Sequence, residues 1–303
     1  MSNSNWFEVE QKLIDNNDND CIWRSRNIRK DKQNIIIYEI WSPVVAMCLF
    51  IKLHLPLRTY QVRMLDSGEA DTMRYENGKW IRNTKHSFAY RNYKKGVFRQ
   101  FKNNVMEMES TGLYISTNKT ADQNKDEVER GYEIPWQNED VLYWLEKLRN
   151  WQEKYNPISK PTDCNELTLK HTQRKVSESY LDAMNDSCFL MRDATATDLE
   201  DRSKPINDAS IPTLWYKLLS KLEDNLRLSG DTLSDGTFFK LVHDYGKGYK
   251  TTKTKTEFPL HSLRVSLITC YIMDAKLPLP VVSKLLAGHS RLLMTIYYAN
   301  LTP

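Results

Sequence analysis

Apolar positions recur at helical spacing in two long segments of the chain. In the first, residues 139–155, they are Val141, Leu142, Trp144, Leu145, Leu148, Trp151 and Tyr155. Spacings of three and four residues place such side chains on one helix face. Asn138 followed by Glu139 and Asp140 favours a helix N-terminus. Residues 212–228 repeat the pattern, with a proline at the start and Gly230 after the end, and predict a second amphipathic helix.

Other segments carry weaker patterns. Residues 35–65 are apolar and predict helix, interrupted at Pro43 and Pro56. Residues 112–136 alternate at both ends and are polar in the middle, which is typical of a β-hairpin. Residues 1–20 are polar and rich in Asn and Asp, so we expect an irregular lead-in. Residues 181–210 are acidic and predict a surface insertion or linker.

These patterns favour an α+β fold that is mainly helical, with a small antiparallel sheet around residues 70–135. The expected organisation is a polar lead-in at residues 1–34, without a full additional domain, and one domain at residues 35–303 with an acidic insertion near 181–210. A chain of 303 residues that is 40% hydrophobic and 27% charged is long and apolar enough to bury a core.

Composition excludes several classes of protein. Five widely spaced cysteines suggest neither a zinc site nor a disulfide framework. The first residues have no basic and apolar leader pattern, which argues against a signal peptide. The most apolar stretch, residues 35–57, contains Glu39, Lys52 and His54, which makes a membrane span improbable. We therefore expect a reduced, cytoplasmic protein with no membrane partner.

The net charge of +4 is modest, but its distribution is uneven. Between Gly78 and Met106 there is no Asp or Glu, and aromatic residues alternate with basic ones. The basic residues are Lys79, Arg82, Lys85, Arg91, Lys94, Lys95, Arg99 and Lys102. One sign of charge mixed with aromatics is typical of a face that contacts phosphates. The alternative is a basic hairpin whose aromatics form core. A second basic patch contains Lys247, Lys250, Lys253 and Lys255.

The candidate chemistry lies in residues 258–301. His261 and Arg264 are three positions apart on a predicted helix and share a face. Pro280 favours the start of the next helix, and Gly288 favours a left-handed turn at its end. His289 then follows directly, and Tyr298 comes nine residues later.

In this order, H-S-L-R, L-L-A-G-H-S and M-T-x-x-Y resemble the C-terminal signature of tyrosine recombinases of the phage-integrase type. The wording is most similar to integrases of large mobile elements, such as the gamma-mobile-trio type. The resemblance extends to L-P-L-R-T-Y, which puts Arg58 at the family's first arginine, and to Lys119 in the predicted hairpin, with Lys125 as its rival. It covers about residues 40–301. Gln61 stands where the family usually has an acidic residue, and Pro56–Leu57 replace a glycine-containing pair.

The resemblance implies site-specific cleavage and rejoining of double-stranded DNA through a 3′-phosphotyrosine, without a metal or nucleotide cofactor. Arg58 and Arg264 would clamp the phosphate, and His261 and His289 would donate hydrogen bonds to it. Lys119 would protonate the leaving 5′-oxygen. Tyr298 would be the nucleophile, with the adjacent Tyr297 as the alternative. Self-association in a synaptic complex on DNA is also implied.

Two other hypotheses remain open. Family members usually carry a helical DNA-binding domain before the first arginine, whereas 57 residues precede Arg58 here. This favours a truncated or degenerate copy that binds DNA without recombining it. The second alternative is a helical interaction protein in which the motifs are coincidental, and such a protein would have no affinity for DNA at low salt.

Overall fold

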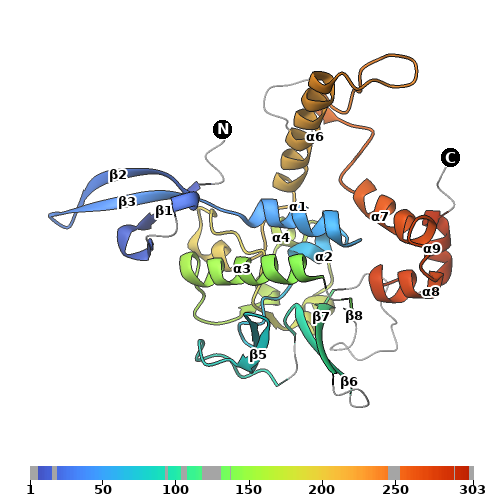
Figure 1. Ribbon diagram of the computed structural model, residues 1–303. Coiled ribbons are helices and arrows are strands. Elements are labelled where there is room, and N and C mark those ends of the chain that lie inside the picture. Colours follow the sequence, from blue (N-terminus) through green and yellow to red (C-terminus); the bar gives the residue numbers. More distant parts are fainter. Residues whose placement is uncertain are drawn as a thin grey trace.

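The computed structural model describes residues 6–15, 19–92, 95–103, 108–117, 131–136, 138–244, 253–289 and 291–299 (Figure 1). The strands are β1 (Trp6–Glu10), β2 (Ile22–Lys30), β3 (Gln33–Trp41), β4 (Met73–Glu76), β5 (Lys79–Arg82), β6 (Phe98–Asn103), β7 (Met108–Ile115), β8 (Tyr132–Ile134), β9 (Thr162–Asp163), β10 (Asp186–Ser187), β11 (His243–Asp244) and β12 (Thr254–Lys255). The helices are α1 (Val44–His54), α2 (Thr59–Arg63), α3 (Glu139–Tyr155), α4 (Leu169–Thr172), α5 (Glu178–Met184), α6 (Ser210–Ser229), α7 (Ser262–Met273), α8 (Leu279–Val281), the π-helical turn η7 (Val282–Leu286) and α9 (Leu292–Ala299).

The N-terminal segment forms an antiparallel sheet in the order β1-β3-β2, at the left of Figure 1. The expected lead-in at residues 1–34 and a helix beginning at residue 35 are therefore wrong. Asp31 and Lys32 both have positive φ angles, as the two-residue turn of a tight hairpin requires. The β-branched run at residues 35–37 then continues as strand because such side chains pack well on a pleated surface.

The predicted helices at the centre of the chain are confirmed. Helix α3 spans the predicted residues 139–155, and the Asn138 side chain accepts a hydrogen bond from the Val141 amide, as an N-cap does. Helix α6 ends at Gly230, whose φ is +79°. Helices α1 and α3 pack against each other in the main core, together with residues of β7, β8 and α7.

The region expected to hold one small sheet contains two. Strands β4 and β5 form one, and the order β6-β7-β8 forms the other. Leu113 of β7 pairs with Ile134 of β8, so the predicted antiparallel pairing of residues 112–136 is confirmed. The segment between them, residues 118–130, lies outside the described residues.

Residues 181–210 are not a surface insertion throughout, and this expectation is corrected. Cys188, Phe189, Leu190, Met191 and Arg192 are fully buried. Their acidic flanks stay near the surface, where Leu199–Ser203 form an exposed turn. The acidic composition hid an apolar run of only four residues, which is too short to give a periodic signal.

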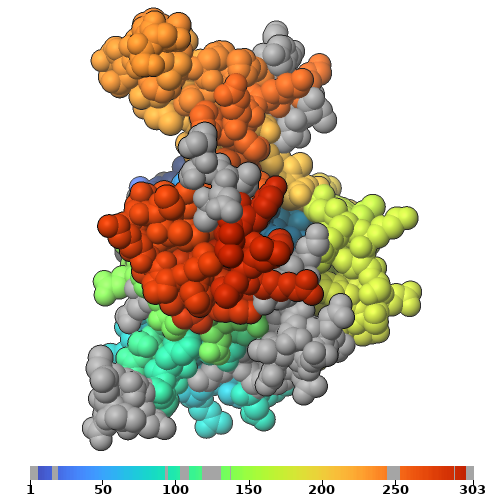
Figure 2. All heavy atoms as spheres, turned by 90° about the vertical axis from the view of Figure 1, so that its right-hand side faces the viewer, coloured from blue at the N-terminus to red at the C-terminus, as the bar shows by residue number. Residues whose placement is uncertain are grey.

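The C-terminal elements gather on one side of the molecule. Helices α7, α8 and α9 lie together at the right of Figure 1, and Figure 2 shows them in red as one continuous face. Helix α6 projects away from the body at the top of both views. Within the described residues, no helix has the length and apolar character to cross a membrane.

Buried ion pairs connect distant segments of the fold. Arg91 binds Asp66 at 3.0 and 2.9 Å, and its Nε lies 3.0 Å from Asp71. Arg192 binds Glu69 at 2.6 Å. Every one of these side chains is buried. A buried charge without its partner is costly, so these pairs hold the segments at residues 66–71, 91 and 192 in one arrangement.

We therefore predict that Arg91→Met lowers the free energy of unfolding by about 3–5 kcal/mol, because it leaves two carboxylates buried beside each other. Lys102→Met is the control, since its partner Glu109 and Lys102 itself are both exposed, and it should cost less than about 1 kcal/mol. Urea denaturation of both variants measures the difference. Equal effects would show that the buried pairs do not anchor the fold.

Candidate active site

Arg264 lies at the centre of the site, on the first turn of α7, and its side chain is fully buried. Its guanidinium donates hydrogen bonds to Pro56 O, to Ala287 O at 2.9 Å and to His289 Nε2 at 2.7 Å. These acceptors come from the segment before α2 and from the segment after η7. One side chain thus joins three parts of the chain that are far apart in sequence.

The segment between α1 and α2 is held from several sides. Lys52 is buried in α1 and donates to Leu57 O at 3.1 Å, and Tyr271 of α7 donates to His54 O at 3.2 Å. Burial and the nearby charge of Arg264 lower the pKa of Lys52 to about 8. Arg58 follows as the N-cap of α2. The fixed carbonyls before it determine where Arg58 enters the site.

His289 is held in one tautomer by its two partners. Arg264 can only donate, so His289 Nε2 accepts, and His289 Nδ1 carries the proton. That proton points at Thr295 Oγ1, 2.8 Å away in α9. Gly288, with φ +60°, turns the chain between η7 and this histidine, as the sequence predicts. The pair His289–Thr295 fastens α9 to the buried arginine.

The surroundings keep both histidines neutral. Burial, followed by the charges of Arg264 and Arg58, lowers the pKa of His289 to about 3. His261 is the N-cap residue of α7. Burial and the charges of Lys52, Arg264 and Arg58 lower its pKa as well. The five side chains are thus close enough for their charges to interact, and the two imidazoles are uncharged at neutral pH.

The remaining predicted catalytic residues are only partly described. Helix α9 contains Tyr297 and Tyr298. The Tyr297 side chain is 63% exposed, whereas the side chain of Tyr298 lies outside what the structure describes. Lys119 and its rival Lys125 fall within residues 118–130, which are also outside it. Strand β8, which follows them in the chain, packs against η7.

The basic residues predicted to contact DNA fall into three groups. Lys79, Arg82 and Lys85 are exposed on or beside the β4–β5 hairpin, although Lys85 also binds Glu76 at 3.0 Å. Lys94, Lys247 and Lys250 lie outside the described residues.

The other basic residues bind groups of the protein itself. Arg91 is a correction, because it is buried in its pairs with Asp66 and Asp71 and presents no surface to DNA. Lys95 donates to the carbonyls of Met184 and Asp186. Arg99 binds Glu133 at 3.1 Å and covers the Tyr114 ring. A stretch without acids can therefore find its counter-charges elsewhere in the fold.

Sequence reasoning did not select Lys52, Gln61 or Thr295 as residues of the site. Lys52 belongs to an apolar helix pattern, where a lysine reads as a solvent-facing side chain. The Gln61 oxygen accepts from the Arg58 amide at 3.0 Å, and its amide donates to Thr117 O at 3.0 Å. Gln61 thereby ties Arg58 to the end of β7. In the sequence, Thr295 only marks the motif that selects Tyr298 over Tyr297. Its contact with His289 depends on tertiary structure.

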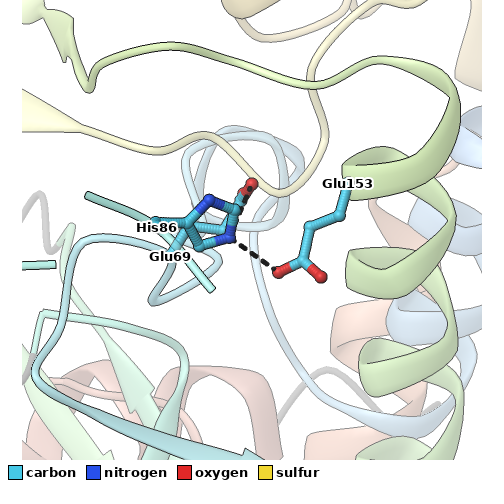
Figure 3. Close-up of side chains that lie close together, drawn as sticks. All are labelled: Glu69, His86 and Glu153. Atoms are coloured by element: carbon cyan, nitrogen blue, oxygen red, sulfur yellow. Dashed lines mark hydrogen bonds and ion pairs between the residues drawn. The ribbon is translucent and has the colours of Figure 1, made fainter. Parts of the chain in front are cut away.

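A second polar cluster lies away from this site and has the composition of a metal centre. Glu69, His86 and Glu153 converge within 4.8 Å (Figure 3). Arg192 already binds Glu69, and Arg74 binds Glu153 at 2.8 Å. His86 bridges the two carboxylates, 3.2 Å from Glu153 and 3.9 Å from Glu69. Because arginines neutralise both acids, we interpret this cluster as an ion-pair network that joins α3 to the β4–β5 region.

A family model described as "Putative integrase" matches residues 1–165, a little more than half of the chain. The chain belongs to this integrase family. The match includes the N-terminal sheet, Arg58 and Lys119, but it does not reach the motifs at residues 258–301. No curated protein and no solved structure matches significantly. Membership points to DNA integration or recombination as the general function and to DNA as the partner.

The integrase should show an acid sensitivity that comes from His289. Its pKa is about 3 in the folded state and near 6.5 when unfolded. Between these values only the unfolded chain takes up this proton, so folding stability falls as the pH decreases below about 6.5 and is unaffected above it.

His289→Gln removes that proton site. Between pH 7 and pH 5, the unfolding free energy of the variant should therefore fall by about 2 kcal/mol less than that of wild type. The expected difference is about 1.4 kcal/mol for each pH unit below 6.5. Denaturant titrations of both proteins at several pH values measure this difference. The contributions of the other titrating groups are common to both proteins and cancel. Parallel pH profiles would contradict a buried, neutral His289.

Proposed function

We propose that the integrase cleaves and rejoins double-stranded DNA as a tyrosine recombinase, through a 3′-phosphotyrosine intermediate and without a metal. The observation that carries this proposal is the convergence of Arg58, Arg264, His261 and His289, which are the four residues that sequence resemblance selects from the described part of the chain.

The charge balance of the site favours an anionic substrate. Lys52 and Arg58 form no ion pair with a carboxylate within the described residues, although Lys52 is buried and Arg58 partly so. Concentrated positive charge away from water is unfavourable unless an anion compensates it. A DNA phosphodiester supplies a negative charge together with acceptor oxygens for planar guanidinium donors. The site therefore suits binding of a phosphate better than binding of a cation or a neutral ligand.

In the proposed reaction, the Tyr298 oxygen attacks phosphorus and forms the tyrosine–phosphate bond. The bond from phosphorus to the 5′-oxygen breaks, and Lys119 protonates that leaving oxygen to give a free 5′-hydroxyl. A neutral histidine can accept the tyrosine proton. Arg58 and Arg264 would stabilise the charge that builds on the non-bridging oxygens. Rejoining reverses these steps with a new 5′-hydroxyl, so the energy of the broken bond is retained.

Helix α9 connects the nucleophile to the anion site. Thr295 is three residues before Tyr298 and bonds to His289, which in turn accepts from Arg264. A phosphate oxygen would compete with His289 Nε2 for the same guanidinium. Binding of DNA would then weaken the contact between Arg264 and His289, and through it the contact between His289 and Thr295 that fixes α9. Occupation of the site would thereby be coupled to the position of Tyr298.

Exposed basic residues outside the site are proposed to hold the DNA backbone. Lys79 and Arg82 on β5 have the exposure that this role requires. The same role is proposed for Lys94, Lys247 and Lys250. Lys85, Lys95 and Arg99 could contribute only by sharing or exchanging their protein partners. Assembly of several copies on DNA is part of the proposal, because recombination joins two duplexes.

The test is covalent trapping on a nicked suicide DNA substrate taken from the ends of the element that encodes the gene. Wild type should give an SDS-resistant adduct, and Tyr298→Phe should remove it, because only the hydroxyl oxygen can attack. Tyr297→Phe is the matched control and should retain the adduct.

The failures of this test are also informative. Loss of the adduct in Tyr297→Phe alone would identify Tyr297, and not Tyr298, as the nucleophile. No adduct despite salt-sensitive DNA binding would identify a degenerate copy that binds without recombining. No DNA binding at low salt would reject both functions.

A further inference from the structure

Tyr132 lies in the site although no sequence motif selects it. It begins β8, directly after the hairpin segment that carries Lys119. Its ring packs so closely against Gly288 that a Cβ at that position would overlap it. The glycine is therefore required twice, for its positive φ angle and for the space that the phenol occupies. This contact packs the start of β8 against the turn that carries His289.

The Tyr132 hydroxyl is buried and makes no hydrogen bond within the described residues. The Gln61 side chain lies beside it, and Arg264 and Arg58 are close enough for their charges to act on it. Gln61 itself has other partners: its oxygen accepts from the Arg58 backbone amide, and its side-chain amide donates to Thr117 O. Burial nevertheless dominates and raises the pKa of Tyr132 to about 12.

Two neighbouring groups share this lack of a partner. Arg58 Nη1 and Thr117 Oγ1 are also buried without hydrogen bonds among the described residues. A guanidinium nitrogen can only donate, and the two hydroxyls can donate. An unpaired buried polar group costs about 1–3 kcal/mol. Donors left unpaired beside two arginines indicate that an acceptor-rich anion completes their hydrogen bonding.

We propose that the Tyr132 hydroxyl donates a hydrogen bond to a non-bridging oxygen of the phosphate bound by Arg58 and Arg264. This inference rests on the proposed function for the identity of the phosphate, but only on the local geometry for anion binding. The hydroxyl stays protonated, so Tyr132 is a donor and not a second nucleophile. The contact of its ring with Gly288 keeps the hydroxyl in place, and Gln61 holds Arg58 through the Arg58 backbone amide.

The experiment uses Tyr132→Phe, which keeps the ring against Gly288 and removes only the hydroxyl. Tyr75→Phe is the matched control, a buried tyrosine of β4 outside the site. On the nicked substrate, Tyr132→Phe should slow adduct formation by about 100- to 1,000-fold at saturating DNA, the order expected for one lost donor at an oxyanion. Its affinity for DNA should change by less than about threefold, because most affinity comes from other phosphates.

A second measurement does not depend on catalysis. Inorganic phosphate, compared with chloride at equal ionic strength, should raise the melting temperature of wild type and of Tyr75→Phe, and should raise that of Tyr132→Phe clearly less. Equal phosphate shifts in all three proteins would overturn the inference, whether or not wild type forms an adduct. An absent shift in wild type would overturn it too. A missing adduct with an intact, Tyr132-dependent shift would reject the proposed function alone.

Discussion

The buried guanidinium of Arg264 is the interaction on which the site depends. A buried guanidinium needs hydrogen-bond acceptors, and its two terminal nitrogens find them in Pro56, Ala287 and His289. Meeting that requirement fixes the segment before Arg58 and the turn before α9 relative to α7. The same geometry selects the tautomer of His289 in which Nδ1 carries the proton and contacts Thr295. A residue proposed to bind substrate thus also organises the protein around the proposed substrate site.

Much of this could be predicted from local sequence, and the limits have physical causes. Helices α3 and α6 were predictable because their apolar spacing and their caps agree. The helix that begins at His261 and the left-handed turn at Gly288 before His289 were predictable because short-range signals determine them. Residues 35–41 form a strand and not the expected helix, since a run of isoleucines does not distinguish helix from strand. Asp31 and Lys32 form the turn before it without a glycine that would mark it in the sequence.

Tertiary pairing explains the other failures. Arg91 belonged to a basic stretch without acids, yet Asp66 and Asp71 come to it from earlier in the chain. The buried run at residues 188–191 was masked by acidic flanks. Tyr132 and Lys52 had no spacing relation to any motif, so only the folded chain brings them to Arg264. The burial of such polar residues depends on which segments of the chain pack together, and the composition of one segment does not reveal its tertiary neighbours.

The most direct measurement of the central claim is the chemical identity of the covalent joint. The trapped adduct is digested and its nucleotide-bearing peptide is sequenced by mass spectrometry, while end-labelling determines which DNA end is released. The proposed mechanism predicts a 3′-phosphate esterified to Tyr298 and a free 5′-hydroxyl, with the same yield in EDTA. A 5′-linked adduct, attachment to a residue outside α9, or cleavage that needs a divalent metal and leaves a 3′-hydroxyl would contradict it.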